Sequence, residues 1–129
     1  MISLVELFVI LFVHWVADFI FQAEEWAINK SKNNKALTLH VLCYSTVWLL
    51  FANAYSVLTG NYLMMCFPVI TFICHWITDY YTSRIVSKKF AKGHYGSPIP
   101  NFGAFTVIGF DQILHYGQLF LTFYLLTSK

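Results

Sequence analysis

Residues 62–84 read YLMMCFPVITFICHWITDYYTSR. This stretch is long and apolar enough for a helix to cross a hydrocarbon layer of ~30 Å, which takes about 20 residues. It lacks the alternation of polar and apolar residues that a strand of a membrane barrel shows. One histidine and one aspartate, His75 and Asp79, interrupt the apolar run. The stretch therefore predicts a membrane-spanning helix with polar groups inside it.

Three more stretches of the chain have the same character, at residues 3–22, 37–59 and 104–127. Over all 129 residues, 58% are hydrophobic and only 11% are charged, whereas a soluble domain carries about 25% charge. This composition excludes a disordered chain, a nucleic-acid-binding protein and an ordinary soluble enzyme. We expect one all-α domain over residues 1–129, a four-helix transmembrane bundle whose direct partner is the lipid bilayer. The first stretch has no basic leader and no small-residue cleavage site, so we expect it to stay in the mature protein.

The basic residues predict how the bundle is oriented. Of the eight lysines and arginines, all but Lys129 lie in or beside the connections at residues 23–36 and 85–103. Basic connections stay on the cytoplasmic side of a membrane. Both termini are therefore expected outside.

A short sequence repeats within the chain. HWVADF at residues 14–19 corresponds to HWITDY at residues 75–80, and a Leu-His pair occurs at residues 39–40 and again at 114–115. This repeat predicts two helix hairpins related by an approximate twofold axis along the membrane normal, with a shared site near the axis.

All three aspartates of the chain lie inside predicted spans, each with a histidine four residues away. The pairs are His14 with Asp18, His75 with Asp79, and Asp111 with His115. A spacing of four residues places both side chains of a pair on one helix face. An aspartate within a spanning helix costs about 2.5 to 3.5 kcal/mol unless it meets a partner. We therefore expect the three pairs to face inward and to meet one another.

The pairs also share a depth. Counted from the cytoplasmic end of each span, the aspartates form one layer and the histidines a second, roughly 6 Å further in. His40 enters the same region from the second span, which makes seven candidate metal ligands: His14, Asp18, His40, His75, Asp79, Asp111 and His115. Imidazole and carboxylate are ligands of zinc, manganese and iron. We expect one or two divalent transition-metal ions, zinc first, either as two ions bridged by an aspartate or as one ion beside a general base.

Other side chains complete the candidate site. We assign Asp79, Asp111 and Gln112 to catalysis, and Gln22 to orienting a carboxylate or holding a substrate oxygen. Three lysines after the third span could hold a phosphate near the membrane surface, although basic residues there also serve as topology signals. They are Lys88, Lys89 and Lys92.

Structural interpretations compete with the metal site. Each pair could be a hydrogen bond that joins helices, at about 0.6 kcal/mol per contact. His40 has no aspartate partner, and His94 lies in a connection. Trp15 and Trp76 are expected to pack rather than to act chemically. The three cysteines, Cys43, Cys66 and Cys74, are expected to be small buried hydrophobes.

These motifs resemble a small uncharacterised family of four-helix integral membrane proteins of bacteria and their phages, a domain of unknown function. The shared pattern is His-x-x-x-Asp-Phe-x-x-Gln at residues 14–22, His40, His-x-x-x-Asp at residues 75–79 and Asp-Gln-x-x-His at residues 111–115. The chain is also loosely similar to membrane-bound metal-dependent hydrolases. The resemblance implies four helices around a polar core in the bacterial inner membrane, or in the host membrane if a phage encodes the chain. It also implies a lysine three residues after Asp79, where this chain has Thr82.

Three functions fit this sequence. The leading one is a metal-dependent hydrolase that acts near the cytoplasmic leaflet on a lipid or lipid-linked head group. The second is a proton or divalent-cation relay or transporter that uses the same ring of groups. The third is a phage or host accessory protein that binds a membrane protein, or a second copy of itself, with a structural metal site.

Overall fold

A computed structural model describes residues 2–96 and 102–128 of the chain. In these residues the fold is all-α, as the sequence predicts. The α-helices are α1 (Leu4–Trp15), α2 (Glu24–Asn29), α3 (Asn34–Thr59), α4 (Phe67–Ala91) and α5 (Ala104–Thr127). A π-helical turn, η1 (Val16–Ile20), extends α1, and a 3-10 turn, η2 (Tyr62–Cys66), leads into α4.

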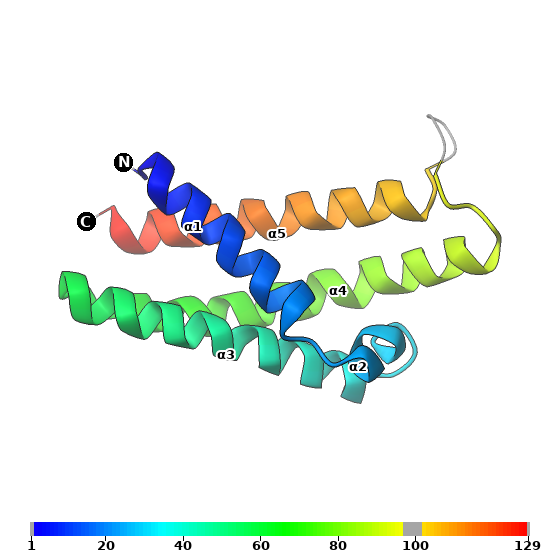
Figure 1. The fold of residues 1–129 in the computed structure, drawn as a ribbon, viewed down its shortest axis with the longest axis horizontal. Coiled ribbons are helices and arrows are strands. Elements are labelled where there is room, and N and C mark those ends of the chain that lie inside the picture. Colours follow the sequence, from blue (N-terminus) through cyan, green and yellow to red (C-terminus); the bar gives the residue numbers. More distant parts are fainter. Residues whose placement is uncertain (1, 97–101, 129) are drawn as a thin grey trace.

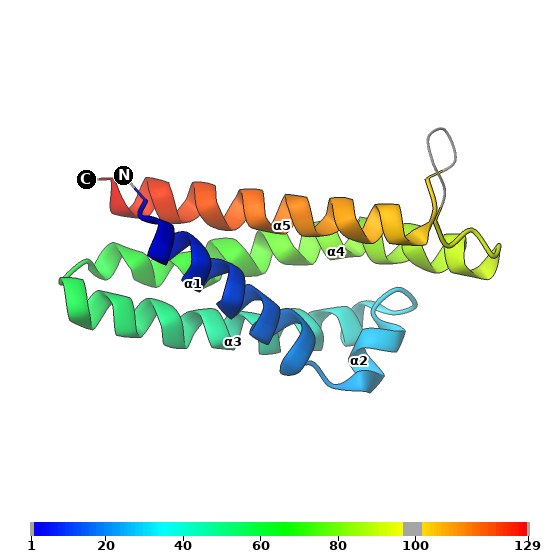
Figure 2. The ribbon, with the colours of Figure 1, turned by 45° about the horizontal axis from the view of Figure 1, so that its top comes forward.

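The long helices lie side by side. Figure 1 shows α3, α4 and α5 running along the molecule, while α1 crosses them obliquely. Both ends of the chain lie at the end of the bundle where α3 turns into α4, and α2 lies toward the opposite end, as Figure 2 also shows. The helix bundle thus has a terminal end, where both termini lie, and an opposite end, near α2.

Local sequence signals explain where the helices begin and end. Ser3 and Glu6 form a reciprocal capping box at the start of α1. The side chain of Asn33 accepts a hydrogen bond of 2.7 Å from the Ala36 amide and so caps α3. Gly60 ends α3 with a φ of 73°, a conformation that glycine adopts without a Cβ penalty.

The interior divides into an apolar part and a polar part. An apolar cluster fills the bundle toward the termini and includes Ile10, Trp48, Met64, Phe67 and Phe123. The buried histidines and aspartates lie beyond it, toward α2. Apolar packing therefore closes the bundle on the terminal side of the polar groups.

The helix boundaries differ from the predicted spans. Two stretches, Asn34–Thr59 and Tyr62–Ala91, are long and apolar enough to cross a membrane by length and composition, among the described residues. The first predicted span is divided, because α1 has 12 residues and ends in the π turn. The last one forms the 24-residue α5, which is not one of these two stretches. Among the described residues, length and composition thus identify two candidate spans, and the four-span arrangement stays a prediction.

The predicted connections are more ordered than expected. The connection at residues 23–36 contains α2 and the start of α3. Helix α4 runs to Ala91, so Lys88 and Lys89 lie on a helix rather than in a loop. No glycine or proline lies between Arg84 and Ala91, so the sequence contains no helix breaker before Gly93.

Candidate functional site

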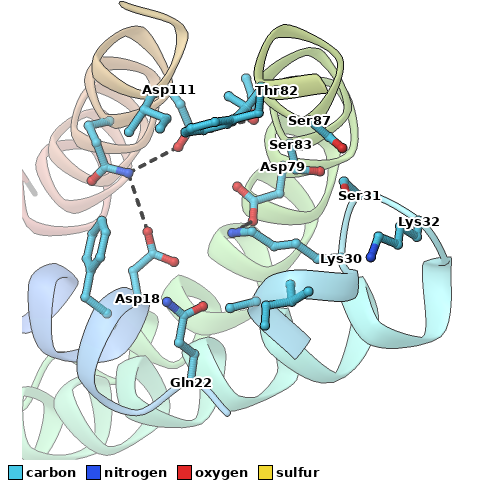
Figure 3. A pocket seen from close by; sticks show the side chains of 17 residues that line it. Asp18, Gln22, Lys30, Ser31, Lys32, Asp79, Thr82, Ser83, Ser87 and Asp111 are labelled. Carbon is cyan, nitrogen blue, oxygen red and sulfur yellow. Dashed lines mark hydrogen bonds and ion pairs between the residues drawn. The ribbon is translucent and has the colours of Figure 1, made fainter. Parts of the chain in front are cut away.

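A cavity of about 570 Å³ opens between η1, α2, α4 and α5. All three aspartates line it, together with the two glutamines that the sequence singled out (Figure 3). The residues that line it and carry polar side chains are Asp18, Gln22, Lys30, Ser31, Lys32, Asp79, Thr82, Ser83, Ser87, Asp111 and Gln112. The predicted polar groups thus meet at one hollow of the molecule.

Asp18, His40 and His75 bring three ligand atoms together beside this cavity, which Asp18 lines and the two histidines do not. The distance between Asp18 Oδ1 and His40 Nε2 is 3.2 Å, that between Asp18 Oδ1 and His75 Nε2 is 3.7 Å, and the two Nε2 atoms are 3.2 Å apart. All three residues are buried. Four ligands at about 2.0 to 2.1 Å from a tetrahedral zinc ion lie roughly 3.3 Å from one another. The three atoms are therefore spaced as ligands of one ion.

Hydrogen bonding alone does not satisfy this arrangement. Nε2 of His40 also lies 3.2 Å from Asp79 Oδ2 and 3.4 Å from Lys30 Nζ. One imidazole nitrogen either donates one proton or accepts one, yet four polar atoms surround this nitrogen. Among the described residues, Asp18 Oδ1 accepts no hydrogen bond although it is buried. A cation that accepts lone pairs from several atoms at once fits these contacts.

A second group of ligand atoms adjoins the first. Asp79 Oδ1 lies 3.2 Å from His115 Nε2, which is 3.3 Å from Asp111 Oδ1. His75 and His115 stack with ring centroids 4.1 Å apart. Thr82 donates a hydrogen bond of 2.6 Å to Asp111 Oδ1. Asp79 thus presents one oxygen to each group.

His14 has a partner on each ring nitrogen. Its Nδ1 lies 2.8 Å from the Tyr44 hydroxyl and its Nε2 lies 2.9 Å from Gln112 Oε1. Because an amide oxygen only accepts, His14 donates from Nε2 and accepts from Tyr44. Its distance to Asp18 Oδ2 is 3.8 Å. The structure therefore gives His14 a role in positioning Gln112, whose amide nitrogen lies 3.1 Å from Asp111 Oδ2 and 3.5 Å from Asp18 Oδ2 (Figure 3).

Lys30 enters the site from the C-terminal end of α2. Its ammonium donates a hydrogen bond of 2.7 Å to Asp79 Oδ2, and 21% of its side chain is exposed. Burial disfavours the charged ammonium, but the nearby carboxylates of Asp79 and Asp18 outweigh burial and raise the pKa of Lys30. Lys30 therefore stays charged and balances one of the buried carboxylates.

Of the other residues predicted for the site, the structure places one in the cavity lining and the rest outside it. Gln22 lines the cavity. Lys88, Lys89 and Lys92 are not among the described residues that line it, and Lys88 and Lys92 are exposed on the far turns of α4 and just beyond it. His94 is exposed as well.

Sequence reasoning missed two residues of the site. Tyr44 follows His40 by four residues, so the same spacing that paired the histidines and aspartates places it on that face. Lys30 carries no such signal, since its sequence neighbourhood is that of the basic residues that indicate topology. Only the fold of the connection brings it to Asp79.

Comparisons with known proteins identify the chain at the level of its family. No curated protein and no solved structure matches it. One protein family matches nearly all of it, over residues 6–129, and this agrees with the resemblance of the motifs to a domain of unknown function. The chain belongs to the family described as "Protein of unknown function (DUF3307)".

Proposed function

We propose that the protein is an integral membrane protein of four spans, with both termini outside. Large apolar side chains are exposed on every long helix, such as Phe8 at 67%, Leu50 at 66% and Phe110 at 59%, while the aspartates inside are at most 9% exposed. Water-soluble proteins rarely expose such continuous apolar surface, and lipid would cover it. Helix α2, the start of α3 and the end of α4, which carry the basic residues, gather at one end (Figure 1). By the positive-inside rule that end is cytoplasmic.

We further propose that the protein is a metal-dependent hydrolase that acts on a lipid or lipid-linked head group at the cytoplasmic leaflet. The observation that carries this proposal is the triangle of Asp18 Oδ1, His40 Nε2 and His75 Nε2, with sides of 3.2 to 3.7 Å, next to an open cavity that Asp18 lines. A structural metal site is closed by protein ligands, whereas a catalytic site keeps a position open to substrate.

The ligand atoms fit two ions with Asp79 between them. His75 belongs to both groups of ligands, but its Nε2 has one lone pair and serves one ion. The first ion would take Asp18, His40, His75 and Asp79. The second would take Asp79, His115 and Asp111; with three protein ligands against the first ion's four, it is the ion that would keep a position open to substrate from the cavity, which Asp79 and Asp111 line. A divalent cation also offsets buried carboxylates, which Lys30 alone does not do for three of them.

The metal, Asp111 and Gln112 have roles that fit a hydrolase. A divalent transition metal supplies polarisation of a substrate oxygen and activation of water. Asp111 faces the cavity and can take a proton from water, since its side chain is 13% exposed. Gln112 holds the carboxylates of Asp18 and Asp111 in place through its amide nitrogen.

A proton or cation relay is the second candidate. Nδ1 of His40 and Nδ1 of His75 are buried without a hydrogen-bond partner in the described residues, whereas metal-ligating histidines usually donate from this atom. That observation favours imidazoles that exchange protons. The apolar cluster around Trp48 and Phe67 argues against it, because it separates the polar groups from the terminal end of the bundle.

Metal analysis tests the proposal. Protein purified in dodecylmaltoside without a histidine tag should carry one or two zinc ions per chain, and His75→Ala and Asp79→Asn should lower that content. His94→Ala is the matched control, because His94 is exposed, and it should leave the metal content unchanged. Zinc-loaded protein in phospholipid vesicles should release a water-soluble product, and chelation should stop the release. Background metal content with an unchanged melting temperature after chelation would refute the metal site and favour the relay, and bound zinc without hydrolysis would favour a structural metal site.

A further inference from the structure

One side of the cavity carries several hydrogen-bond donors around the carboxylate of Asp79. Lys30, Ser31 and Lys32 line it from the end of α2, and Ser83 and Ser87 line it from α4. Figure 3 shows the two serines of α4 on the same side as Ser31 and Lys32, apart from Asp18 and Gln22. The hydroxyl of Ser83 is buried and has no hydrogen-bond partner among the described residues. An unpaired hydroxyl and two lysines in the lining of one cavity provide donors for an anion.

We infer that this side of the cavity binds the phosphate group of the substrate, so that the substrate is a phosphate ester. The inference rests on the proposed function, since it names the substrate class of the same cavity. A phosphate carries up to two charges and several acceptor oxygens, which ammonium groups and hydroxyls satisfy together. Ser83 and Ser87 are four residues apart on α4 and share a helix face. Lys32 supplies positive charge, and Lys30 adds to it once a metal ion shares the Asp79 carboxylate to which Lys30 otherwise donates.

The charge of the cavity makes this binding depend on the metal. The aspartates at its base carry three negative charges, which repel a phosphate. Lys30 already donates to Asp79 and offsets one of them. Divalent ions bound to the histidines and aspartates would change the net charge at the bottom of the cavity from negative to positive. Phosphate should therefore bind the zinc-loaded protein and bind the chelated protein weakly.

The mouth of the cavity indicates an amphiphilic ester. Phe19, Ile28 and Phe90 line the cavity and are 46%, 55% and 41% exposed. Their apolar surface continues the apolar outside of the bundle. A phosphate inside the cavity could thus belong to a lipid whose chains lie along these side chains, or to a free phosphate compound.

Isothermal titration with two probes tests the inference and separates these sources. The probes are inorganic phosphate and dioctanoyl phosphatidic acid, each added to the full-length protein in detergent after zinc loading has been measured. Ser83→Ala and Lys32→Gln should each weaken the binding of both probes by about 3- to 10-fold, the size of a typical lost hydrogen bond. Lys35→Gln is the matched control, because Lys35 is an exposed lysine of the same segment that does not line the cavity. It should change the affinity by less than about twofold.

Each outcome has one meaning. Tighter binding of the lipid than of inorganic phosphate assigns the ester to a lipid, and equal binding assigns it to a soluble compound. The inference is overturned if zinc-loaded protein binds neither probe. It is also overturned if Lys32→Gln and Lys35→Gln lose the same affinity for the probes. The metal site stands in both cases. Protein that binds no zinc refutes the proposed function as well, and the zinc titration alone reveals this. Circular dichroism of each variant excludes loss of the fold as the cause.

Discussion

The ion pair between Lys30 and Asp79 should be worth about 1.5 to 3 kcal/mol in the zinc-free protein. Its N–O distance is 2.7 Å, and the Asp79 side chain is only 2% exposed. Hydrogen bonds to charged groups fall in this range. A fully buried pair would lose about 3 to 5 kcal/mol when one partner is removed, but water reaches part of the Lys30 side chain and reduces the loss.

A double-mutant cycle measures this energy. Lys30→Met, Asp79→Asn and the double variant are compared with the wild type by unfolding in mixed micelles with a chelator present, and the coupling is the non-additive part of the free energy of unfolding. The matched cycle with Lys35→Met should give a coupling near zero, because Lys35 is exposed. Zinc should lower the Lys30–Asp79 coupling toward the ~0 to 1 kcal/mol of an exposed pair, since the ion then shares the Asp79 carboxylate.

Two results would refute this reasoning. A coupling below about 0.5 kcal/mol without zinc would mean that the ammonium is not paired with Asp79. A coupling that zinc leaves unchanged, in protein that demonstrably binds zinc, would place the ion away from Asp79.

Three further predictions concern the fold. After the native cysteines are replaced by serine, Lys35→Cys and Lys92→Cys should react with a membrane-impermeant reagent only from the cytoplasmic side, and labelling of either from the outside would reverse the topology. Tyr44→Phe should lower the free energy of unfolding by about 1 to 3 kcal/mol, measured in micelles, because it leaves the buried His14 Nδ1 without a donor; an unchanged stability would contradict that hydrogen bond. Gly60→Ala should lower the free energy of unfolding by about 1 kcal/mol, because alanine is strained at the positive φ of this position. An unchanged melting temperature would contradict the left-handed conformation at the end of α3.

The spacing of histidine and aspartate was enough to predict which side chains meet. In all three pairs a histidine nitrogen lies within 3.3 to 3.8 Å of the aspartate four residues away. This succeeds because the period of a helix fixes which residues share a face, and because apolar surroundings leave polar groups no place other than the interior.

The roles within the cluster could not be predicted in the same way. The repeat makes His14 and His75 equivalent in sequence, yet His14 bonds to Tyr44 and Gln112 while His75 lies 3.2 Å from His40. Which atoms meet depends on how the helices cross, and α1 crosses obliquely and ends in a π turn. The twofold relation of the hairpins stays a prediction.

Lys30 shows a different limit of prediction from sequence. Spans are recognised by hydropathy, which treats the residues between them only as connections and counts their charge. The return of α2 over the site depends on a long-range contact with Asp79, 49 residues away in sequence. No local pattern encodes such a contact.

Helix α2 has a consequence for how site occupancy can be observed. It has six residues, none of them buried, and it has no side-chain cap. Such a segment has little packing of its own to keep it ordered, and the bond from Lys30 to Asp79 anchors its C-terminal end. Its backbone amides should therefore exchange with deuterium at a rate set by the state of Asp79, slowly while the ammonium is bound and faster once another cation takes the carboxylate. The short helix would then act as a built-in reporter of the site, readable by mass spectrometry without any label.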